Sequence, residues 1–501
     1  MEDVSSRIDR SFQSFGDRLA LCVGGRRYTY SQLAARAFAI HRLIDAIAPD
    51  DSLVGVFAAD ALDTYASVLA ILRAGKGFVP INPTHPKERN SQIIRSAGLS
   101  VVLAPSDEQC ASLKADFDSL NVVSTSSLDD APCTDFSYPP PSAIAYVLFT
   151  SGSTGEPKGV AITRGNLNEF TEALPATGAD FSEQDRVLQS FDLTFDFSIA
   201  SYLVPFCFGS CVFATSPDKI KFTEIYRLLV GEKLTVAPMV PSTLNYLRPY
   251  FDEIELPDLR HSMLCGEALH DDVAAEWAKC TPNSRIFNFY GPTEATVFAL
   301  VHEWQRDAHP RAAQNGVVSI GRPFGNNRAV IVDGEGKVAD ESIVGELCLA
   351  GPQLTPGYWN DPARNATSFF ELQCKEGPIR HYRTGDLATL ERDGNYYFRG
   401  RLDKQVKIQG FRIELGEIEF HARAAFGNSI CVVLPYTNDS GITELHLFIE
   451  GYDGKLDPGM EQLRQRIPHY MVPNGASVIE RLPLNPNGKI DSGALRALLG
   501  R

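Results

Sequence analysis

The chain has 501 residues, so two or more domains are expected, because a single hydrophobic core rarely grows beyond about 250–300 residues. Hydrophobic residues make up 44% and charged residues 22%, which is typical of a globular protein and excludes a disordered or membrane-spanning chain. The formal net charge of −15 disfavours nucleic acid and anionic membranes as partners. The sequence therefore predicts no nucleic-acid partner and no membrane insertion.

The cysteines and the N-terminus indicate the compartment. The ten cysteines are scattered and include no C-x-x-C pair, which favours reduced thiols over a disulfide framework or a zinc site. The first residues, MEDVSSRIDR, are polar and contain no signal-peptide core. We therefore expect a cytoplasmic protein.

Residues 1–140 alternate between helical and strand patterns. An apolar-periodic helix begins at Tyr30 and runs through Leu43, with Ser31 as its expected N-cap. A buried strand over 53–58, a helix over 64–74 and a strand over 77–81 follow. Repeated strand–helix–strand units predict an α/β core with a largely parallel sheet.

An apolar strand over 144–149 leads into residues 150–159, TSGSTGEPKG, here called the glycine-rich segment. Its glycines allow the backbone to approach an oxyanion, its hydroxyls donate hydrogen bonds, and its lysine adds positive charge, so it suits a phosphate. The spacing excludes the Walker loop G-x-x-x-x-G-K-[ST] and the nucleophile elbow G-x-S-x-G. A flexible surface loop is the alternative.

The full glycine-rich segment resembles the phosphate loop of the adenylate-forming superfamily, which comprises acyl-CoA synthetases, luciferases and adenylation domains of nonribosomal peptide synthesis. Motifs of this superfamily extend from Leu72 to Asp491 and cover nearly the whole chain. The resemblance implies an α/β N-terminal domain over 1–402 that binds ATP and substrate, and a small mobile α+β C-terminal domain over 403–501. The resemblance assigns seven residues of the segment to ATP binding: Thr150, Ser151, Gly152, Ser153, Thr154, Gly155 and Lys158. It also assigns a catalytic role to Thr150.

Asp196 lies between Phe195 and Phe197 in a strongly apolar stretch. It is either the N-cap of a helix that Pro205 interrupts or a counter-ion for a cationic ligand, because an acid in an apolar wall needs a partner. In superfamily members that activate α-amino acids, an aspartate at the matching position holds the substrate ammonium, and acyl-CoA synthetases lack it. The resemblance therefore implies an amino-acid substrate.

Two motifs further along the chain match the superfamily. Residues 264–268, LCGEA, resemble the turn that lies against the adenine and the substrate. D-alanine–D-alanyl carrier protein ligases carry Cys-Gly-Glu at this turn. The alternative for Cys265 is a cysteine of the hydrophobic core without a binding role. Residues 288–294, NFYGPTE, offer a tyrosine face for adenine, an amide for its edge, and oxygens for phosphate and Mg²⁺, with an ordinary Gly-Pro turn as the alternative. The candidate ATP-binding residues are Gly266, Glu267, Asn288, Phe289, Tyr290, Gly291 and Thr293, and Glu294 is a candidate catalytic metal ligand.

The C-terminal third supplies the remaining candidates. Asp386 follows a turn as an exposed acid, and the resemblance assigns it to the ribose hydroxyls, with Arg401 also at the nucleotide. Asp403 would be the hinge and Gly410 would lie beside a pantetheine arm, although 405–408 also reads as an ordinary exposed strand. Lys489 matches the catalytic, ATP-binding lysine that swings into the site; an Asn-Gly-Lys turn is otherwise solvated.

If the pocket follows the superfamily, seven residues line it and only one of them is charged. A charged substrate side chain would be buried unpaired there, so a small neutral amino acid is expected. D-alanine comes first, because Cys265 and Gly351-Pro352 resemble the D-alanine ligases, with L-alanine, proline and threonine as rivals. The lining residues are Asp196, Phe197, Ala200, Met263, Cys265, Val297 and Phe298.

The sequence thus predicts a ligase that uses ATP and Mg²⁺ to adenylate a small amino acid. It would then transfer the acyl group as a thioester to the phosphopantetheine arm of a separate carrier protein, because no carrier domain follows the last motif. An acyl- or aryl-CoA synthetase is the alternative, and a catalytically silent binding module is a third possibility.

Overall fold

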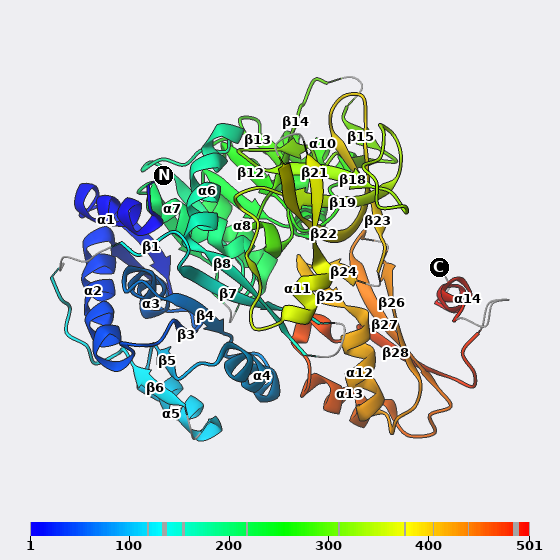
Figure 1. Ribbon diagram of the computed structural model, residues 1–501, viewed down its shortest axis with the longest axis horizontal. Helices are drawn as coiled ribbons and strands as arrows, with labels where there is room; N and C mark the ends of the chain where they lie inside the picture. The colour runs from blue at the N-terminus through cyan, green and yellow to red at the C-terminus, as the bar shows by residue number, and fades with distance from the viewer. Residues whose placement is uncertain are drawn as a thin grey trace. The chain divides into compact units, whose positions relative to one another are not determined.

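The computed structural model describes residues 2–117, 120–132, 138–152, 156–216, 219–308, 311–374, 377–403, 405–438, 440–483 and 490–499 (Figure 1). The chain forms two compact units. Unit 1 comprises 1–83, 94–149 and 159–402, and unit 2 comprises 84–93, 150–158 and 403–501. Most of the glycine-rich segment is therefore grouped with the C-terminal part of the chain.

The larger sheet of unit 1 has, within the described ranges, nine strands in the order β17-β14-β13-β12-β11-β9-β10-β1-β2. The neighbours from β13 to β1 pair in parallel, and the antiparallel strands lie at the two edges. The bounds are β1 (Leu19–Val23), β2 (Arg26–Thr29), β9 (Arg186–Gln189), β10 (Cys211–Ala214), β11 (Val236–Met239), β12 (His261–Leu264), β13 (Arg285–Tyr290), β14 (Leu300–Trp304) and β17 (Arg322–Pro323).

The second sheet of unit 1 has the order β20-β8-β7-β4-β3-β5-β6. The pairs β3–β4, β3–β5, β4–β7 and β5–β6 are parallel, so the predicted α/β class with largely parallel sheets is confirmed. The bounds are β3 (Leu53–Phe57), β4 (Gly77–Ile81), β5 (Val101–Ala104), β6 (Asn121–Ser124), β7 (Ile144–Thr150), β8 (Lys158–Thr163) and β20 (Gly357–Tyr358).

Helices of unit 1 fill the space between these sheets and cover an outer face. One apolar cluster joins Leu21 of β1, Leu69 of α3 and Leu148 of β7, so this core lies between the two sheets. Another joins Ile286 of β13 to Trp277 of α10, so α10 belongs to a separate layer. The bounds are α1 (Val4–Ser14), α2 (Tyr30–Ile47), α3 (Leu62–Arg73), α5 (Asp107–Asp116), α6 (Arg164–Ala173), α7 (Val204–Cys207), α8 (Lys221–Gly231), α9 (Pro241–Leu247) and α10 (Asp271–Cys280). Helix α4 (Lys87–Ala97) is shared by the two units, because 87–93 belong to unit 2 and 94–97 to unit 1.

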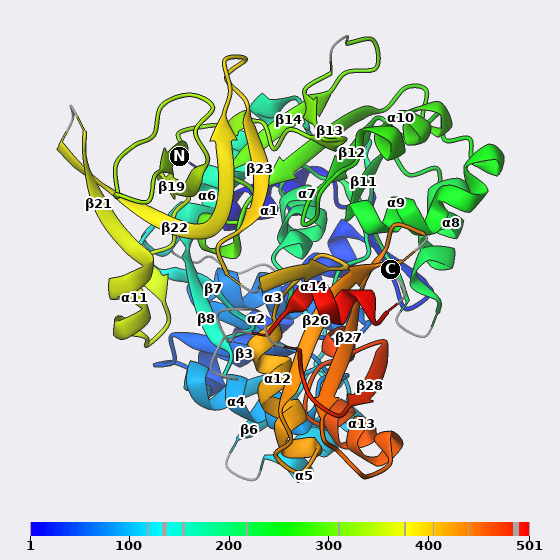
Figure 2. The same cartoon turned by 90° about the vertical axis from the view of Figure 1, so that its right-hand side faces the viewer.

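A third, antiparallel sheet completes unit 1 and has the order β18-β19-β22-β21, with β23 also paired to β22. Its longest strand, β22, forms an extended hairpin with β21 (Figure 2). This sheet carries two candidate nucleotide-binding residues, Asp386 and Arg401. The bounds are β18 (Arg328–Val332), β19 (Gly345–Ala350), β21 (Phe369–Cys374), β22 (Gly377–Leu390), β23 (Tyr396–Arg401) and α11 (Pro362–Ser368), and a short hairpin, β15 (Ala313–Gln314) with β16 (Val317–Val318), precedes it.

Unit 2 is an α+β unit built on a small sheet, β26-β27-β28. Alternation along β26 and β27 gives the sheet two apolar faces: Leu447 packs with Ile418 of α12, and Phe448 packs with Leu495 of α14. The helices therefore cover both faces. The bounds are β24 (Gln405–Ile408), β25 (Phe411–Glu414), α12 (Leu415–Ala425), β26 (Cys431–Thr437), β27 (Thr443–Glu450), α13 (Leu456–Arg464), β28 (Gly475–Ile479) and α14 (Ser492–Ala497).

The N-cap of α2 corrects one sequence-based expectation. Thr29, and not Ser31, accepts the backbone N–H of Gln32, and the Gln32 side chain accepts the backbone N–H of Thr29 in return. This capping box satisfies two helix donors at once, whereas a cap at Ser31 would satisfy one. The helix therefore begins at Tyr30, as predicted.

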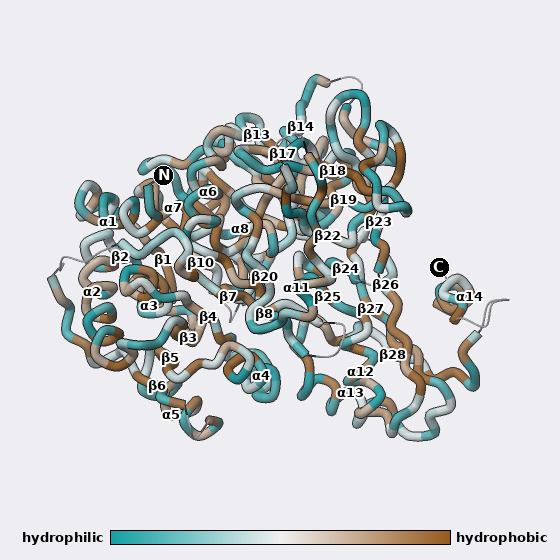
Figure 3. Tube along the Cα trace, in the orientation of Figure 1, coloured by the Kyte–Doolittle hydropathy of each residue, from teal (hydrophilic) through white to brown (hydrophobic). Residues whose placement is uncertain are grey.

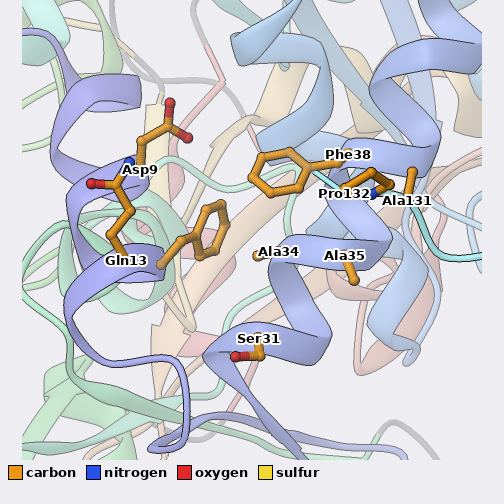
Figure 4. A pocket seen from close by; sticks show the side chains of 9 residues that line it. Asp9, Gln13, Ser31, Ala34, Ala35, Phe38, Ala131 and Pro132 are labelled. Atoms are coloured by element: carbon orange, nitrogen blue, oxygen red, sulfur yellow. The ribbon is translucent and has the colours of Figure 1, made fainter. Parts of the chain in front are cut away.

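The hydropathy of the chain differs between its strands and helix α4. Hydrophobic stretches follow the inner strands, and α4 is mostly hydrophilic (Figure 3). In the part of the chain that the structure describes, no helix combines the length and the apolarity that a membrane crossing requires. A cavity of about 290 Å³ lies between α1 and α2, lined mainly by Phe12, Ala34 and Phe38 (Figure 4). Its acid, Asp9, is paired with Arg73, and no candidate site residue lines it.

Candidate functional site

The candidate residues of unit 1 gather at the carboxyl edge of the larger sheet. Strands β13, β12, β11 and β9 are parallel neighbours, so the segments that follow them start at the same edge. Asp196 follows β9, Glu267 follows β12 and Glu294 follows β13. Ligands of α/β sheets bind outside the carboxyl ends of the strands, and this edge is therefore the candidate site.

Four phenylalanines form one side of the candidate site, and we call Phe191, Phe197, Phe289 and Phe298 the aromatic wall. Phe191 stacks on Phe197 with ring centroids 4.3 Å apart, and Phe289 stacks on Phe298 at 4.4 Å. An edge-to-face contact at 5.0 Å joins Phe197 to Phe298. All four rings are buried, and such pairs contribute about 0.5–1.5 kcal/mol each beyond their area. The contacts therefore hold the four rings against one another.

Asp196 is buried beside this wall at 7% exposure. The helical run that contains the π-helix Ile199–Leu203 begins at Phe197, directly after Asp196, and the Asp196 backbone O accepts the backbone N–H of Ile199 at 2.9 Å. Asp196 thus occupies the position of a helix cap, and both the cap and the counter-ion interpretations stay predictions. Burial raises the pKa of the Tyr146 phenol well above its ordinary value, and the Asp196 carboxylate raises it further. Asp196 therefore lies near the tyrosine of β7, in surroundings that penalise an isolated charge.

The remaining pocket candidates surround the same edge. Ala200 is completely buried in the π-helix and Met263 is completely buried on β12. Cys265 is buried directly after β12 and donates its backbone N–H to Met239 O at 3.3 Å. Among the described residues these positions add no charge to that of Asp196.

Val297 lies in a turn whose backbone is strained. Thr296 and Val297 have φ angles of 56° and 68°, which β-branched residues rarely adopt. Gln353, 1% exposed, fixes this turn: its backbone O accepts the Thr296 hydroxyl at 2.6 Å and its amide donates to Phe298 O at 2.7 Å. A side chain at Gly291 would meet Val297 O at 2.5 Å, so the turn also requires this glycine. The strain is therefore held by surrounding contacts.

The turn after β12 and the end of β13 carry candidates for the base. Gly266 has a φ of 93°, which favours glycine, and Glu267 accepts the backbone N–H of Ser242 at 2.8 Å. Asn288 is buried and donates to Ser319 O at 2.8 Å, which leaves its amide oxygen for other partners. Both side chains are thus positioned by backbone contacts.

Tyr290, Asp386 and Arg401 form a buried polar cluster. The Tyr290 hydroxyl donates to Asp386 Oδ2 at 2.5 Å, and Arg401 donates to Asp386 Oδ1. Burial, and then the Asp386 carboxylate, raises the pKa of Tyr290 well above its ordinary value, so the hydroxyl stays a donor. The expectation that Asp386 is exposed after a turn was wrong: it is 3% exposed within β22, because β23 and Tyr290 cover it.

Glu294 fits the carboxylate that a magnesium site would need. It is completely buried in a short 3₁₀ turn that also contains Thr293, and it accepts the Tyr358 hydroxyl at 2.6 Å. The described residues contain no group of three or more His, Cys, Asp or Glu side chains that could hold a metal. Mg²⁺ commonly takes one or two carboxylates and completes its shell with substrate phosphates and water, so one oriented carboxylate is sufficient.

The described part of the glycine-rich segment makes polar contacts within unit 2. Ser151 Oγ donates to Arg412 O at 2.6 Å and accepts the backbone N–H of Glu414 at 3.2 Å. Gly152 donates its backbone N–H to Glu417 Oε2 at 3.1 Å. One amide of the segment therefore donates to a carboxylate oxygen of the same unit.

Two side chains of the segment differ in their partners. Thr150 Oγ1 is buried and has no hydrogen-bond partner in the described parts of the chain. Such an orphaned hydroxyl at a strand end is a candidate for ligand contact. Lys158 is buried, with Nζ 3.9 Å from Glu414 Oε1. The segment thus combines an available hydroxyl with a buried cation.

The other C-terminal candidates are placed only in part. Asp403 accepts the backbone N–H of Gln405 at 3.1 Å, and Gly410 has a φ of 85° in the turn between β24 and β25. Ser153, Thr154, Gly155 and Lys489 lie outside the described residues.

Sequence reasoning missed two residues of unit 1 and one residue of unit 2 that hold candidate segments in place. Gln353 supports the strained turn, Tyr358 orients Glu294, and Glu417 binds both the Gly152 amide and Arg89, whose Nη1 lies 2.5 Å from Glu417 Oε1. None of them lies in a motif that was assigned chemistry. Glu417 follows Asp403 and Gly410, the two residues of this stretch to which a role was assigned. The glutamates at 414, 417 and 419 were the sequence feature that could have drawn attention to it.

The chain belongs to the AMP-binding enzyme family, which it matches over residues 8–359. It is 33% identical to one polypeptide of the linear gramicidin synthase of Brevibacillus parabrevis over 98% of its own length, but spans only 10% of that polypeptide. It is 32% identical to zwittermicin A synthase ZmaJ of Bacillus cereus, covering 97% of this chain and 92% of the relative.

A solved structure extends this similarity to the fold. The adenylation domain AlmE of Vibrio cholerae, in complex with glycyl-adenosine-5'-phosphate, matches with a TM-score of 0.85 and 26% identity. The match covers 99% of this chain and 97% of AlmE. The two-unit α/β architecture is therefore that of an adenylation domain.

Proposed function

We propose that this protein activates a small neutral amino acid with ATP and then transfers it, as a thioester, to the phosphopantetheine arm of a separate carrier protein. The observation that carries this proposal is the buried Asp196 carboxylate beside the aromatic wall. A buried acid favours an ammonium partner, and the wall limits the size of the side chain attached to it.

The first half-reaction needs positioning and charge neutralisation more than acid–base chemistry. The substrate carboxylate is ionised at neutral pH and attacks the α-phosphorus of ATP, and pyrophosphate leaves. Asp196 would hold the ammonium, while Tyr290, Asp386 and Arg401 would receive the adenosine. The Thr150 hydroxyl, the amides of the glycine-rich segment and Lys489 would offset the charge of the phosphates. Mg²⁺ held by Glu294 would neutralise phosphate charge as the bond to pyrophosphate breaks.

The second half-reaction requires a thiol to reach the acyl-adenylate. We infer a domain boundary after Leu402, with Asp403 as the hinge about which residues 403–501 rotate and withdraw Lys489. Gly410 would lie beside the incoming pantetheine arm and leave room for it, because a side chain at this position would obstruct the arm. The thiol sulfur forms a bond to the carbonyl carbon, and AMP leaves.

The substrate class follows from volume and charge. Phe197, Met263 and Phe298 are buried and apolar, so they would favour a short side chain and would offer no partner to a charged one. The match to AlmE, a structure containing a glycyl adenylate, supports a compact amino acid as the substrate. D-alanine stays the first candidate, ahead of L-alanine, proline and threonine. A CoA synthetase for acyl or aryl acids is the alternative, and Asp196 disfavours it.

The test is ATP–pyrophosphate exchange with Mg²⁺ and a panel of D- and L-amino acids, fatty acids and aryl acids. We expect exchange with glycine, alanine and other compact amino acids, and little with lysine, glutamate or tryptophan. Robust exchange with fatty or aryl acids alone would refute amino-acid activation. A clear preference for an L-residue would refute only the D-alanine assignment.

A further inference from the structure

Asp196 lies in a loop whose two ends are joined by a pair of buried side chains. Gln189 is the last residue of β9, and Ser201 lies in the π-helix Ile199–Leu203. The Ser201 hydroxyl donates to Gln189 Oε1 at 2.5 Å, and the two residues are 0% and 2% exposed. We call Gln189 and Ser201 the loop clamp. It joins residues 12 positions apart, and Asp196 lies between them.

The same glutamine also holds the backbone at one end of the aromatic wall. Gln189 Nε2 donates to Phe191 O at 2.9 Å, and Gln189 Oε1 accepts the Phe191 N–H at 3.3 Å. The amide nitrogen needs an acceptor and the amide oxygen needs donors, so these partners fix the orientation of the amide. Phe191 stacks on Phe197 at 4.3 Å, and Lys221 Nζ lies 5.7 Å from the Phe191 ring centroid. Gln189 therefore sets where the Phe191 end of the wall lies.

The loop between the two clamp residues is also bonded internally. Asp192 Oδ1 accepts the backbone N–H and the hydroxyl of Thr194, each at 2.9 Å. The Phe195 N–H donates to Asp192 O at 3.0 Å, and the Ile199 N–H donates to Asp196 O at 2.9 Å. Asp196 is thus carried by a loop that has its own hydrogen bonds and is joined at both ends. Its carboxylate is therefore expected to shift when the clamp is removed.

The clamp also adjoins two predicted pocket residues. Phe197 and Ala200 belong to the same helical run as Ser201, and both are buried. π-Helical turns are rare, and they occur frequently at functional sites. The clamp therefore ties the segment that carries these pocket candidates to the end of β9.

We propose that Gln189 and Ser201 are positioning residues that set the affinity and the size selectivity for the amino acid without touching it. The clamp fixes Asp196 and the aromatic wall relative to each other, so the site is pre-organised before the substrate binds. This inference rests on the proposed function, because it takes Asp196 as the ligand of the substrate ammonium. The clamp acts on the amino acid and leaves ATP binding unchanged.

The first experiment makes one substitution at two neighbouring serines. Ser201→Ala removes the clamp hydroxyl. Ser198→Ala is the matched control, because Ser198 is equally buried in the same helical run and its hydroxyl has no hydrogen-bond partner in the described ranges. In pyrophosphate exchange, Ser201→Ala should raise KM for the preferred amino acid by about tenfold and leave KM for ATP unchanged, because small displacements of a binding group are costly.

The discrimination between alanine and valine should fall in the same variant. A residue that served only the stability of the fold would not separate the two KM values in this way. Equal KM values for the amino acid in Ser201→Ala and Ser198→Ala would overturn the proposal. So would equal increases in KM for ATP and for the amino acid.

A double-mutant cycle tests whether the clamp residues act as one unit. Gln189→Met has a side chain of similar length and removes the amide bonds. The double variant Gln189→Met/Ser201→Ala should raise KM for the amino acid no further than Gln189→Met does, because the bond between the two residues is already absent. Effects that multiply would show that the residues act independently and would contradict the clamp.

Hydrogen exchange tests the clamp without any substrate. The amides of residues 191–199 should exchange faster in Ser201→Ala than in the wild type or in Ser198→Ala. Equal rates in the two variants would overturn the clamp whatever the substrate is. Absence of amino-acid-dependent pyrophosphate exchange in the wild type would instead refute the proposed function, so the two failures are distinguishable.

Discussion

The aromatic wall of unit 1 and the glycine-rich segment of unit 2 hold their functional groups by different forces. The wall is a chain of ring contacts at 4.3, 5.0 and 4.4 Å among buried phenylalanines. The segment is held by single polar contacts, from Ser151 to Arg412 and from Gly152 to Glu417. Apolar packing fixes one arrangement, whereas polar contacts can exchange for others of similar energy. In the proposed function, this difference would suit a substrate pocket that selects and a phosphate segment that must release its product.

The largest effect is expected where a charge lies beside the wall. Asp196→Asn should abolish amino-acid activation, because a buried ammonium without its counter-charge costs about 3–5 kcal/mol, on the order of two to four decades in kcat/KM. The measurement is pyrophosphate exchange with the preferred amino acid, and Asp252→Asn, at an exposed acid, is the control. Near-normal kinetics of Asp196→Asn would remove the ammonium role.

The next effect should appear in the buried ion pair of unit 2. Arg89 is 4% exposed and Glu417 is 1% exposed, so Arg89→Met leaves a buried carboxylate unpaired and should destabilise unit 2 by about 3–5 kcal/mol. Hydrogen exchange of α12 amides measures this loss. The double variant Arg89→Met/Glu417→Leu should recover much of it, and equal protection in the single variant would show that the pair is not needed.

A smaller effect should follow from releasing the strained turn. Gln353→Leu leaves Phe298 O without its donor and should lower the free energy of unfolding by about 1–3 kcal/mol. Because Val297 and Phe298 then shift, exchange should discriminate less between alanine and valine. Gln305→Leu, at an exposed amide, is the matched control. Unchanged discrimination would show that the wall keeps its shape without Gln353.

The smallest effect concerns pH. Burial raises the pKa of Glu417 above its ordinary value, although Arg89 and the Gly152 amide lower it in part. Because the folded pKa is raised, its contribution to stability is present below the unfolded pKa and declines as pH rises through the folded one. Relative to Glu417→Gln, the wild type should therefore lose thermal stability on going from pH 4 towards neutrality. A difference that is independent of pH would contradict this environment.

The sequence by itself determined the fold class, and it predicts the chemistry of the main segments. Strand–helix alternation sufficed for the parallel sheets, because hydrophobic periodicity is local. The glycine-rich segment and the stretch that contains Tyr290 and Glu294 could be found because each is contiguous and its residue types match one chemical task. The pocket residues could be listed only through the resemblance to a family.

The tertiary structure alone decided which distant residues support these segments. Gln353 reaches Phe298, Tyr358 reaches Glu294, and Asp386 is buried against Tyr290 because separate elements cross there. Cys22 lies opposite Phe213 because β10 adds to the sheet beside β1 after a long crossover. Contacts between residues so far apart depend on strand order and register, which local propensity and spacing do not encode.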